Sequence, residues 1–417
     1  MRILFTNNTL DHPAGTELSL RDAAVRMSER DHDVIGYSRQ QGEVADSLRQ
    51  LGIPVVSELS EIPVGWEPDL IHGHHEWETS MAALKYPNSP ILSFCRGVHA
   101  WQEAPCTAPN VVRYAVVDLG CRDRLIRNFH IPDTEIDLVL NGINLGQFPE
   151  REKYAKKVKR VLVFSNYAKE DNYLAVIREA CEAESVECEA IGAGVRRTIS
   201  DPSDYLLDAD LVFAKGKAAL EACATGCTVV VCDEPGLAPN LVRPDNFQKY
   251  RELSFGYPIM TEPHDVEAYR ARINGHHPGR AEEVCQLARE TGSIEATIDR
   301  LEEVYARTLH NWDHGLRELV DLESFATWAA AYFEKKTTAC KLGRECQEIW
   351  RAMENESDPG RHARPISSAD ETIESHRIMD TLRKAPKLKE ELKAQKKEIR
   401  KRDKEGDKKG SRGLFRR

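Results

Sequence analysis

The stretch AKGKAALEACATGC, residues 214–227, places a glycine between two lysines where an apolar run gives way to an alanine-rich pattern. The run before it, LVF, is typical of a buried strand, and the alanines after it favour a helix. In open α/β sheets, ligands bind beyond the carboxyl ends of the strands, where free N–H groups at the start of a helix attract anions. Lys215 and Lys217 beside that positive helix end would be unfavourable without an anion, so a phosphate at Gly216 would resolve the conflict. The alternative is that both lysines point to solvent and Gly216 forms a plain turn.

Glu221 lies four residues after Lys217 in this stretch. The spacing allows an i,i+4 ion pair on the surface of a helix. It equally allows a carboxylate that accepts hydrogen bonds from a ribose diol, as such acids do in nucleotide sites. Its small neighbours indicate close packing of the helix, so that Glu221 does not lie on a freely solvated face; they are Ala222, Cys223, Ala224 and Gly226.

Outward from this stretch, short β-like runs alternate with helical patterns in both halves of the chain, which predicts an α/β fold with parallel sheets. In the first half we expect strands at 2–8, 33–38, 68–75, 90–95, 113–119 and 136–143, and helices that include 15–32 and 42–52. In the second half we expect strands at 160–166, 186–194, 209–216 and 227–233, and a helix at 171–184. This restart of the pattern predicts two consecutive α/β units rather than one large sheet.

A charged segment without apolar periodicity, EREKYAKKVK at 150–159, suits a linker between the two units. The chain of 417 residues is also longer than one core usually supports. We therefore predict a first domain over 1–150 and a second over 151–335, whose last part is mainly helical. A helical extension with a basic, disordered tail is expected over 336–417.

The net charge of −10 conceals a strong asymmetry. From Arg383 onward there are 16 Lys and Arg against 6 Asp and Glu, a net charge of +10, which leaves −20 for the rest of the chain. A solvated charge run is the simplest interpretation. Attraction to anionic lipid, at roughly 1 kcal/mol per well-placed basic residue, is the sharper one and would suit a lipid-linked substrate. Nucleic-acid binding is disfavoured, because aromatic residues for base stacking are missing apart from Phe415.

The location expected for the protein is the cytoplasm. No stretch approaches the roughly 18 consecutive apolar residues of a membrane span, and the start MRILFTNN lacks the apolar core of a signal peptide. The eleven cysteines include no C-x-x-C pair, and most lie in apolar context, as buried thiols do in a reducing compartment. We expect no disulfides and no structural zinc, and the basic tail could hold the protein at the inner membrane face.

Three histidines, His72, His74 and His75, raise the question of a metal site, because imidazoles at i and i+2 of a strand share one side. Acidic or thiol partners at the spacing of known metal sites are absent from the sequence. We therefore favour histidines at the end of a strand and predict no metal.

Several motifs follow one another in a particular order: a glycine loop and Glu17 at the start of the first helix, PDLIHGHH at 68–75, GVHAW at 97–101, LVLNGINLGQF at 138–148 and ALEACATGCTVVVCD at 219–233. In order and spacing they resemble the family 4 glycosyltransferases, which have the GT-B fold. The resemblance runs from residue 1 to about 335. It implies two Rossmann-like domains that face a cleft, a nucleotide-diphosphate sugar held mainly by the second, an acceptor held by the first, and transfer with retention at the anomeric carbon. It implies no metal or other cofactor.

The resemblance also implies site residues. Glu221 corresponds to the ribose-binding acid, and Gly216 to the glycine whose following amides meet the diphosphate. Gly15, with Thr16 beside it, corresponds to the first-domain glycine loop near the phosphates. His99 corresponds to the histidine near the reacting end of the sugar and is the candidate catalytic residue; without the resemblance, a packed loop residue is the favoured interpretation.

The chain departs from the family pattern at two positions. The family usually has a second acid eight residues before the ribose acid, and this position holds Phe213. The usual arginine after the first strand of the second domain corresponds to Asn166, with Lys169 as the basic residue of the same loop. Lys215 and Lys217 are a possible source of the missing positive charge.

The sequence therefore predicts an enzyme, a glycosyltransferase that moves a sugar from a nucleotide-diphosphate sugar to a glycan or lipid-linked acceptor. One alternative is a nucleotide-sugar epimerase of the same fold, which would need no acceptor. Another is a non-catalytic sugar-nucleotide-binding subunit, suggested by Phe213 and Asn166.

Overall fold

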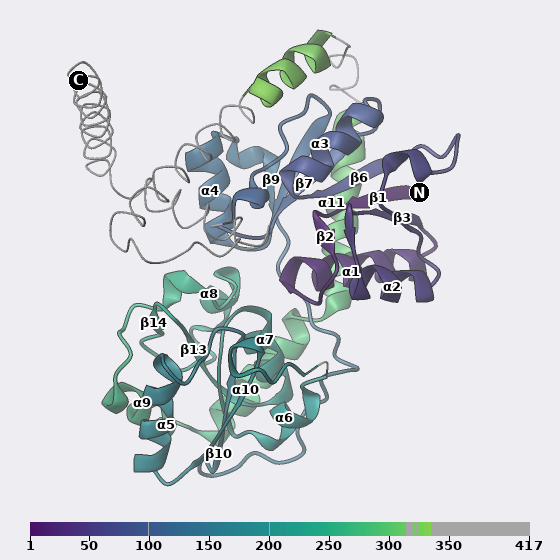
Figure 1. Ribbon diagram of the computed structural model, residues 1–417. Coiled ribbons are helices and arrows are strands. Elements are labelled where there is room, and N and C mark those ends of the chain that lie inside the picture. Colours follow the sequence, from purple (N-terminus) through teal and green to yellow (C-terminus); the bar gives the residue numbers. More distant parts are fainter. Residues whose placement is uncertain (99, 200, 314–320, 322, 335–417) are drawn as a thin grey trace, which may run out of the picture. The chain divides into compact units, whose positions relative to one another are not determined.

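The computed structural model describes residues 1–98, 100–199, 201–313, 321 and 323–334. One compact unit spans Met1–Phe325 and contains every feature discussed below, and a second begins at Ala326. The first unit holds two large sheets, one built from strands up to Leu138 and one from strands that begin at Arg160 (Figure 1). This confirms the predicted α/β class with two consecutive sheets. The predicted extension over 336–417, with its basic tail, lies outside the described residues.

The first sheet has seven strands, all parallel, in the order β5-β3-β1-β6-β7-β8-β9. Strands β6 and β7 are buried along their whole length, the pattern of a parallel sheet that helices cover on both faces. The strands are β1 (Arg2–Thr6), β3 (Asp33–Tyr37), β5 (Val55–Val56), β6 (Leu70–His74), β7 (Ile91–Cys95), β8 (Val111–Val116) and β9 (Ile136–Leu138). The helices are α1 (Gly15–Glu29), α2 (Glu43–Gln50), α3 (Glu76–Lys85) and α4 (Leu119–Phe129); β2 (Thr9–Leu10) and β4 (Gln40–Gln41) pair separately.

The second sheet has five strands in the order β11-β10-β12-β13-β14, and only β14 is antiparallel to its neighbour. Its strands are β10 (Arg160–Phe164), β11 (Glu187–Ile191), β12 (Leu211–Ala214), β13 (Thr228–Asp233) and β14 (Gly236–Leu237). Its helices are α5 (Tyr173–Ala183), α6 (Ser203–Asp208), α7 (Gly216–Thr225), α8 (Phe247–Glu252), α9 (Val266–Asn274) and α10 (Pro278–Thr291). Strands β12 and β13 are completely buried, so that only their carboxyl ends can present residues to a ligand.

The last helix of this unit, α11 (Ile294–Asn311), returns to the first sheet. Its residues Ile298, Leu301, Val304 and Tyr305 belong to the same buried cluster as the strands of that sheet. The preceding helix α10 instead packs in the core of the second sheet, through Val284 and Ala288. The predicted domain division at 150 and 335 stays a prediction, and the packing of α11 shows that the chain crosses between the two cores more than once.

Side-chain caps mark where several helices begin. Asp118, Asn172 and Ser293 precede α4, α5 and α11, and each accepts a hydrogen bond from an N–H group in the first turn of its helix. Among the described residues, no helix is both long enough and apolar enough to cross a membrane.

Candidate functional site

The start of α7 is the feature that the sequence singled out. Strand β12 ends at Ala214, and Gly216 turns the chain with φ of 61°, in the left-handed region that glycine enters without strain. A Cβ atom added at Gly216 would meet nothing within 4 Å, so this backbone borders open space. The N–H of Gly216 donates to the carbonyl of Phe255 at 3.1 Å. Within the described residues, the N–H groups of Lys217 and Ala218 have no acceptor, which leaves two donors at the positive end of the helix.

Glu221 lies one turn further along α7 and is 8% exposed. No hydrogen bond or ion pair joins its carboxylate to any other described residue. Burial raises the pKa of Glu221 to about 7, and the nearby charge of Lys217 only partly offsets this effect. A buried carboxylate without a partner is costly, and it is a common feature of binding sites.

Lys215, the residue before α7, is engaged within the second sheet rather than free. Its ammonium pairs with Asp233 at the carboxyl end of β13 and donates to the hydroxyl of Tyr257 at 2.7 Å. It also lies 4.3 Å from the ring centre of Tyr167 and 4.4 Å from that of Tyr257. Burial alone would lower the pKa of Lys215, but Asp233 and Tyr257 outweigh burial and raise it. Lys215 is therefore a fixed positive charge whose position two tyrosines and a carboxylate determine.

Lys217 points the other way, toward the first sheet. Its ammonium donates to Oδ2 of Asp22 on α1 at 2.9 Å, across 195 positions of sequence. The other carboxylate oxygen of Asp22 pairs with Arg21 at 2.9 Å. Burial alone would raise the pKa of Asp22, but Lys217 and Arg21 together hold it below the usual value, so Asp22 is ionised at neutral pH. The two lysines of the opening stretch thus have different carboxylate partners.

The predicted loop after β10 reaches the start of α7 through one of its residues. Asn166 is exposed, and its side-chain oxygen accepts the N–H of Ala193 at 3.0 Å, which ties the loop to the end of β11. Lys169 is exposed, and its N–H donates to the side chain of Asn172. Tyr167, between the two, is the residue of this loop that reaches Lys215.

Gly15 and Thr16 form the first residues of α1. A Cβ atom added at Gly15 would meet nothing within 4 Å, so this helix start also borders open space. The hydroxyl of Thr16 donates to the carboxylate of Glu17 at 2.9 Å. The ion pair between Lys217 and Asp22 joins α1 to the start of α7. That Gly15 and Thr16 share a site with α7 stays a prediction.

His99 lies outside the described residues, and its role stays a prediction. The loop on either side of it is held by Arg124 of α4, which donates to the carbonyls of Gly97 at 2.6 Å, Glu103 at 3.0 Å and Ala100 at 3.1 Å. Glu103 also accepts the N–H of Arg96 at 2.8 Å. Both ends of the segment that carries His99 are therefore fixed.

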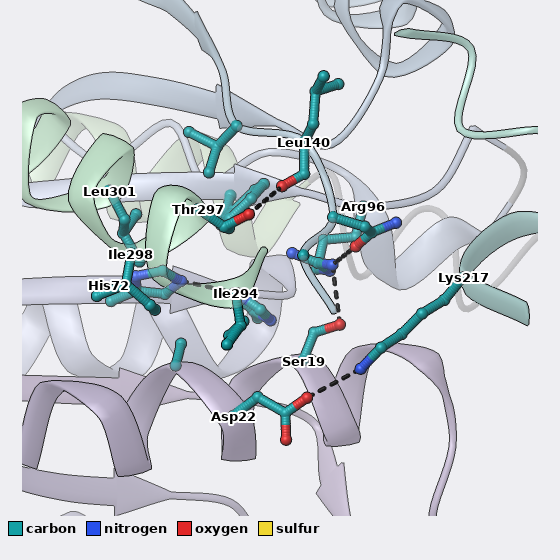
Figure 2. Close-up of a pocket in the computed structure, with 16 residues that line it drawn as sticks. Ser19, Asp22, His72, Arg96, Leu140, Lys217, Ile294, Thr297, Ile298 and Leu301 are labelled. Carbon is teal, nitrogen blue, oxygen red and sulfur yellow. Dashed lines mark hydrogen bonds and ion pairs between the residues drawn. The ribbon is translucent and has the colours of Figure 1, made fainter. Parts of the chain in front are cut away.

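A small cavity lies where the first sheet, α1, α11 and Lys217 meet (Figure 2). Its volume of about 30 Å³ has room for roughly one water molecule. Arg96, just after β7, lines it and donates to the hydroxyl of Ser19 at 2.8 Å and to the side chain of Asn141. No carboxylate among the described residues lies within ion-pairing distance of Arg96, and burial lowers its pKa. Asn141 donates in turn to Ser254 at 3.2 Å, a second link between the two halves of the unit.

Two of the three histidines line the same cavity. His72 and His74 lie on one side of β6, as predicted, with their Nε2 atoms 2.8 Å apart. Nδ1 of His72 is 2.6 Å from the hydroxyl of Tyr305 on α11. Burial lowers the pKa of His72 to about 3 and also lowers that of His74, so both rings are neutral. His72 joins the first sheet to α11, and neither ring adds charge to the site.

Several residues of the site were not predicted from the sequence. Asp233 ends a strand at the ligand edge of a parallel sheet, and the rule for such sheets could have identified it. Arg96 directly follows the carboxyl end of β7, so the same rule applies to it. Asp22 gave no such signal, because an acid within a helix is an ordinary surface residue until its partner from the other half is known.

Comparisons with known proteins support the fold. Neither a known family model nor a protein of curated function matches the sequence. Solved structures do match. Anabaena Alr3699/HepE in complex with UDP-glucose aligns with a TM-score of 0.54 at 13% identity, over 74% of this chain and 100% of that one. A glycosyltransferase from Rickettsia africae aligns with a TM-score of 0.52 at 12% identity, over 74% and 98%. The chain has the GT-B fold of these structures.

Proposed function

We propose that this chain is a glycosyltransferase that moves a sugar from a nucleotide-diphosphate sugar to a glycan or lipid-linked acceptor, with retention at the anomeric carbon. The observation that carries the proposal is Glu221: a buried carboxylate with no partner among the described residues, one turn beyond the unpaired N–H groups of Lys217 and Ala218. The similar HepE structure, solved with UDP-glucose, makes a nucleotide sugar the first candidate donor.

In this proposal the second half holds the donor. Glu221 accepts hydrogen bonds from the ribose diol, because two hydroxyl donors would satisfy a carboxylate that is otherwise unpaired. The N–H groups after Gly216 and the ammonium of Lys217 bind the diphosphate. Positive charge at the helix start stabilises the negative charge that develops on the leaving diphosphate. Asn166 and Lys169 approach the donor from the loop after β10.

The first half completes the site and holds the acceptor. Gly15 and Thr16 contribute the start of a second helix on the opposite side of the diphosphate. His99 lies near the reacting end of the sugar, where the contacts of Arg124 on both sides of it would keep the loop in place. We assign residues 1–150 to the acceptor domain and 151–335 to the donor domain, with α11 as the segment that links the donor domain back to the first core. The protein acts in the cytoplasm in this proposal.

A non-catalytic nucleotide-sugar-binding subunit is a second candidate, and Phe213 favours it. Phe213 has no exposed surface, and its ring packs edge-on against Tyr269 in the core of the second sheet. It cannot replace an acid that contacts the donor sugar. A nucleotide-sugar epimerase is the third candidate, and dependence on an acceptor separates it from a transferase.

A thermal-shift screen across nucleoside diphosphates and their sugars tests the proposal. A ligand at 100 times its Kd stabilises the folded state by about 2.7 kcal/mol, so a donor that fits gives a clear rise in Tm. We expect one nucleotide class to stabilise the protein, Glu221→Gln to abolish that shift, and the exposed Glu179→Gln on α5 to preserve it. Labelled donor should then turn over only with an acceptor. A shift without turnover would favour the non-catalytic subunit, and no shift with any nucleotide would contradict the proposal.

A further inference from the structure

We propose that Asp22 competes with the donor diphosphate for Lys217, so that the ion pair between them is an autoinhibitory contact of the nucleotide site. The inference rests on the proposed function, since it supposes that a diphosphate binds at the start of α7. It adds Asp22, a residue of the first half, to that site. Asp22 weakens diphosphate binding, whereas the other residues of the site strengthen it.

The geometry places one cation between two possible anions. Lys217 is the second residue of α7, next to the N–H groups that face no acceptor, yet its ammonium lies 2.9 Å from Asp22 on α1 (Figure 2). Both side chains are partly buried, with exposed fractions of 30% for Lys217 and 23% for Asp22. Water therefore screens this pair less than it would screen a pair on the open surface. Glu221, one turn along the same helix, is near enough to Lys217 for its pKa to respond to that charge.

A diphosphate carries more negative charge than a carboxylate, so it attracts the same ammonium more strongly. If Asp22 stayed on Lys217 while phosphate bound there, two anions would share one cation and repel each other. Lys217 must therefore leave Asp22, or Asp22 must weaken the binding. Asp22 can release it at low cost, because its other oxygen keeps the partner Arg21 at 2.9 Å.

Arg96 is a second positive charge beside this ion pair. It lines the same cavity as Asp22 and Lys217, and its polar contacts there are with neutral groups, Ser19 and Asn141. Arg96 has no direct ion pair with any described residue, and the carboxylates of Glu103, Asp118 and Asp22 act on its charge only at longer range. The pair with Asp22 thus neutralises the lysine that a diphosphate would need. After transfer, the return of Lys217 to Asp22 favours release of the nucleoside diphosphate.

Isothermal titration with UDP, GDP and ADP on the full-length protein tests this inference. We expect Asp22→Asn to lower the Kd of the nucleoside diphosphate that binds wild type by about two- to fivefold, the upper part of the range measured for ion pairs near the surface. The matched control is Glu29→Gln, which removes one negative charge from the exposed end of the same helix and should leave Kd unchanged. Melting curves establish that each variant is folded.

A double-mutant cycle with Lys217→Gln separates competition for the lysine from plain repulsion by Asp22. In the Lys217→Gln background, Asp22→Asn should cause little further increase in nucleotide affinity. An equal gain in both backgrounds would overturn the competition, and so would weaker binding by Asp22→Asn, which would mean that Asp22 orients Lys217 for phosphate. If wild type and the Glu29→Gln control bind no nucleoside diphosphate, neither in this titration nor in the thermal-shift screen, the proposed function fails and this inference fails with it. Binding by wild type that Asp22→Asn leaves unchanged contradicts this inference alone.

Discussion

Glu221 combines three properties that ordinary helix residues do not share. It is 8% exposed, it has no hydrogen-bond partner among the described residues, and burial raises its pKa to about 7. A surface ion pair with Lys217, the alternative that the spacing left open, is not formed, because Lys217 pairs with Asp22 instead. The helix therefore holds the carboxylate in place without a partner from the described part of the chain, which is an unfavourable state that a ligand can relieve.

The raised pKa of Glu221 predicts how the free energy of unfolding depends on pH. The folded state keeps the proton of Glu221 up to about pH 7, while the unfolded chain loses it near the ordinary value of 4.5. The folded state thus binds more protons between these values, and the free energy of unfolding falls as pH rises through that window. Between pH 4.5 and 7, the free energy of unfolding of wild type should fall by up to roughly 3 kcal/mol relative to that of Glu221→Gln. Above pH 7 the difference should stay constant.

Urea denaturation of both proteins at several pH values measures this difference. The exposed Glu179→Gln is the control, because it changes the same chemical group on a solvated helix face and should keep the wild-type pH profile. Parallel profiles for wild type and Glu221→Gln would show that Glu221 titrates normally and would remove the buried carboxylate from the account.

At the scale of elements, α11 is the helix whose position the sequence did not predict. It follows α10 without a long loop and has an apolar face, which suits packing in either core. The structure places it on the first sheet, where Tyr305 contacts Nδ1 of His72 at 2.6 Å. The specific contact is a buried hydrogen bond between groups 233 positions apart, a separation over which no periodic pattern carries information.

Tyr305→Phe should destabilise the protein by about 1–3 kcal/mol, because it leaves Nδ1 of the fully buried His72 without its partner. The same substitution at Tyr205, whose hydroxyl bonds Arg197 at the surface, should change the free energy of unfolding by less than about 0.5 kcal/mol. Chemical denaturation of the two variants makes the comparison. Equal stability of both would mean that packing alone, without this hydrogen bond, holds α11 on the first sheet.

For the whole molecule, local patterns in the sequence predicted the elements well and their contacts poorly. The buried apolar runs around Leu211–Ala214 and Thr228–Asp233 stand out because parallel strands covered on both faces are apolar throughout. The turn at Gly216 and the close packing of Glu221 were likewise predicted from neighbouring residues. These features depend on residues a few positions apart.

The partners of the two lysines could not be predicted in this way. Lys215 pairs with Asp233 from the next strand, and Lys217 with Asp22 from the other half of the unit. Both ion pairs depend on which segments the tertiary fold brings together. The sequence identified the positive charges of the candidate site, and only the structure showed that each of them pairs with a carboxylate.

The central claim, that Glu221 binds the ribose of a nucleotide at the start of α7, is tested most directly by titration calorimetry with a nucleoside diphosphate and its 2′,3′-dideoxy analogue. Wild type should bind the diol form at least about tenfold more tightly than the analogue, since each hydrogen bond to a charged group contributes about 1.5–3 kcal/mol. Glu221→Gln should lose most of that preference. An equal preference in Glu221→Gln and wild type, or no preference in wild type, would contradict the account.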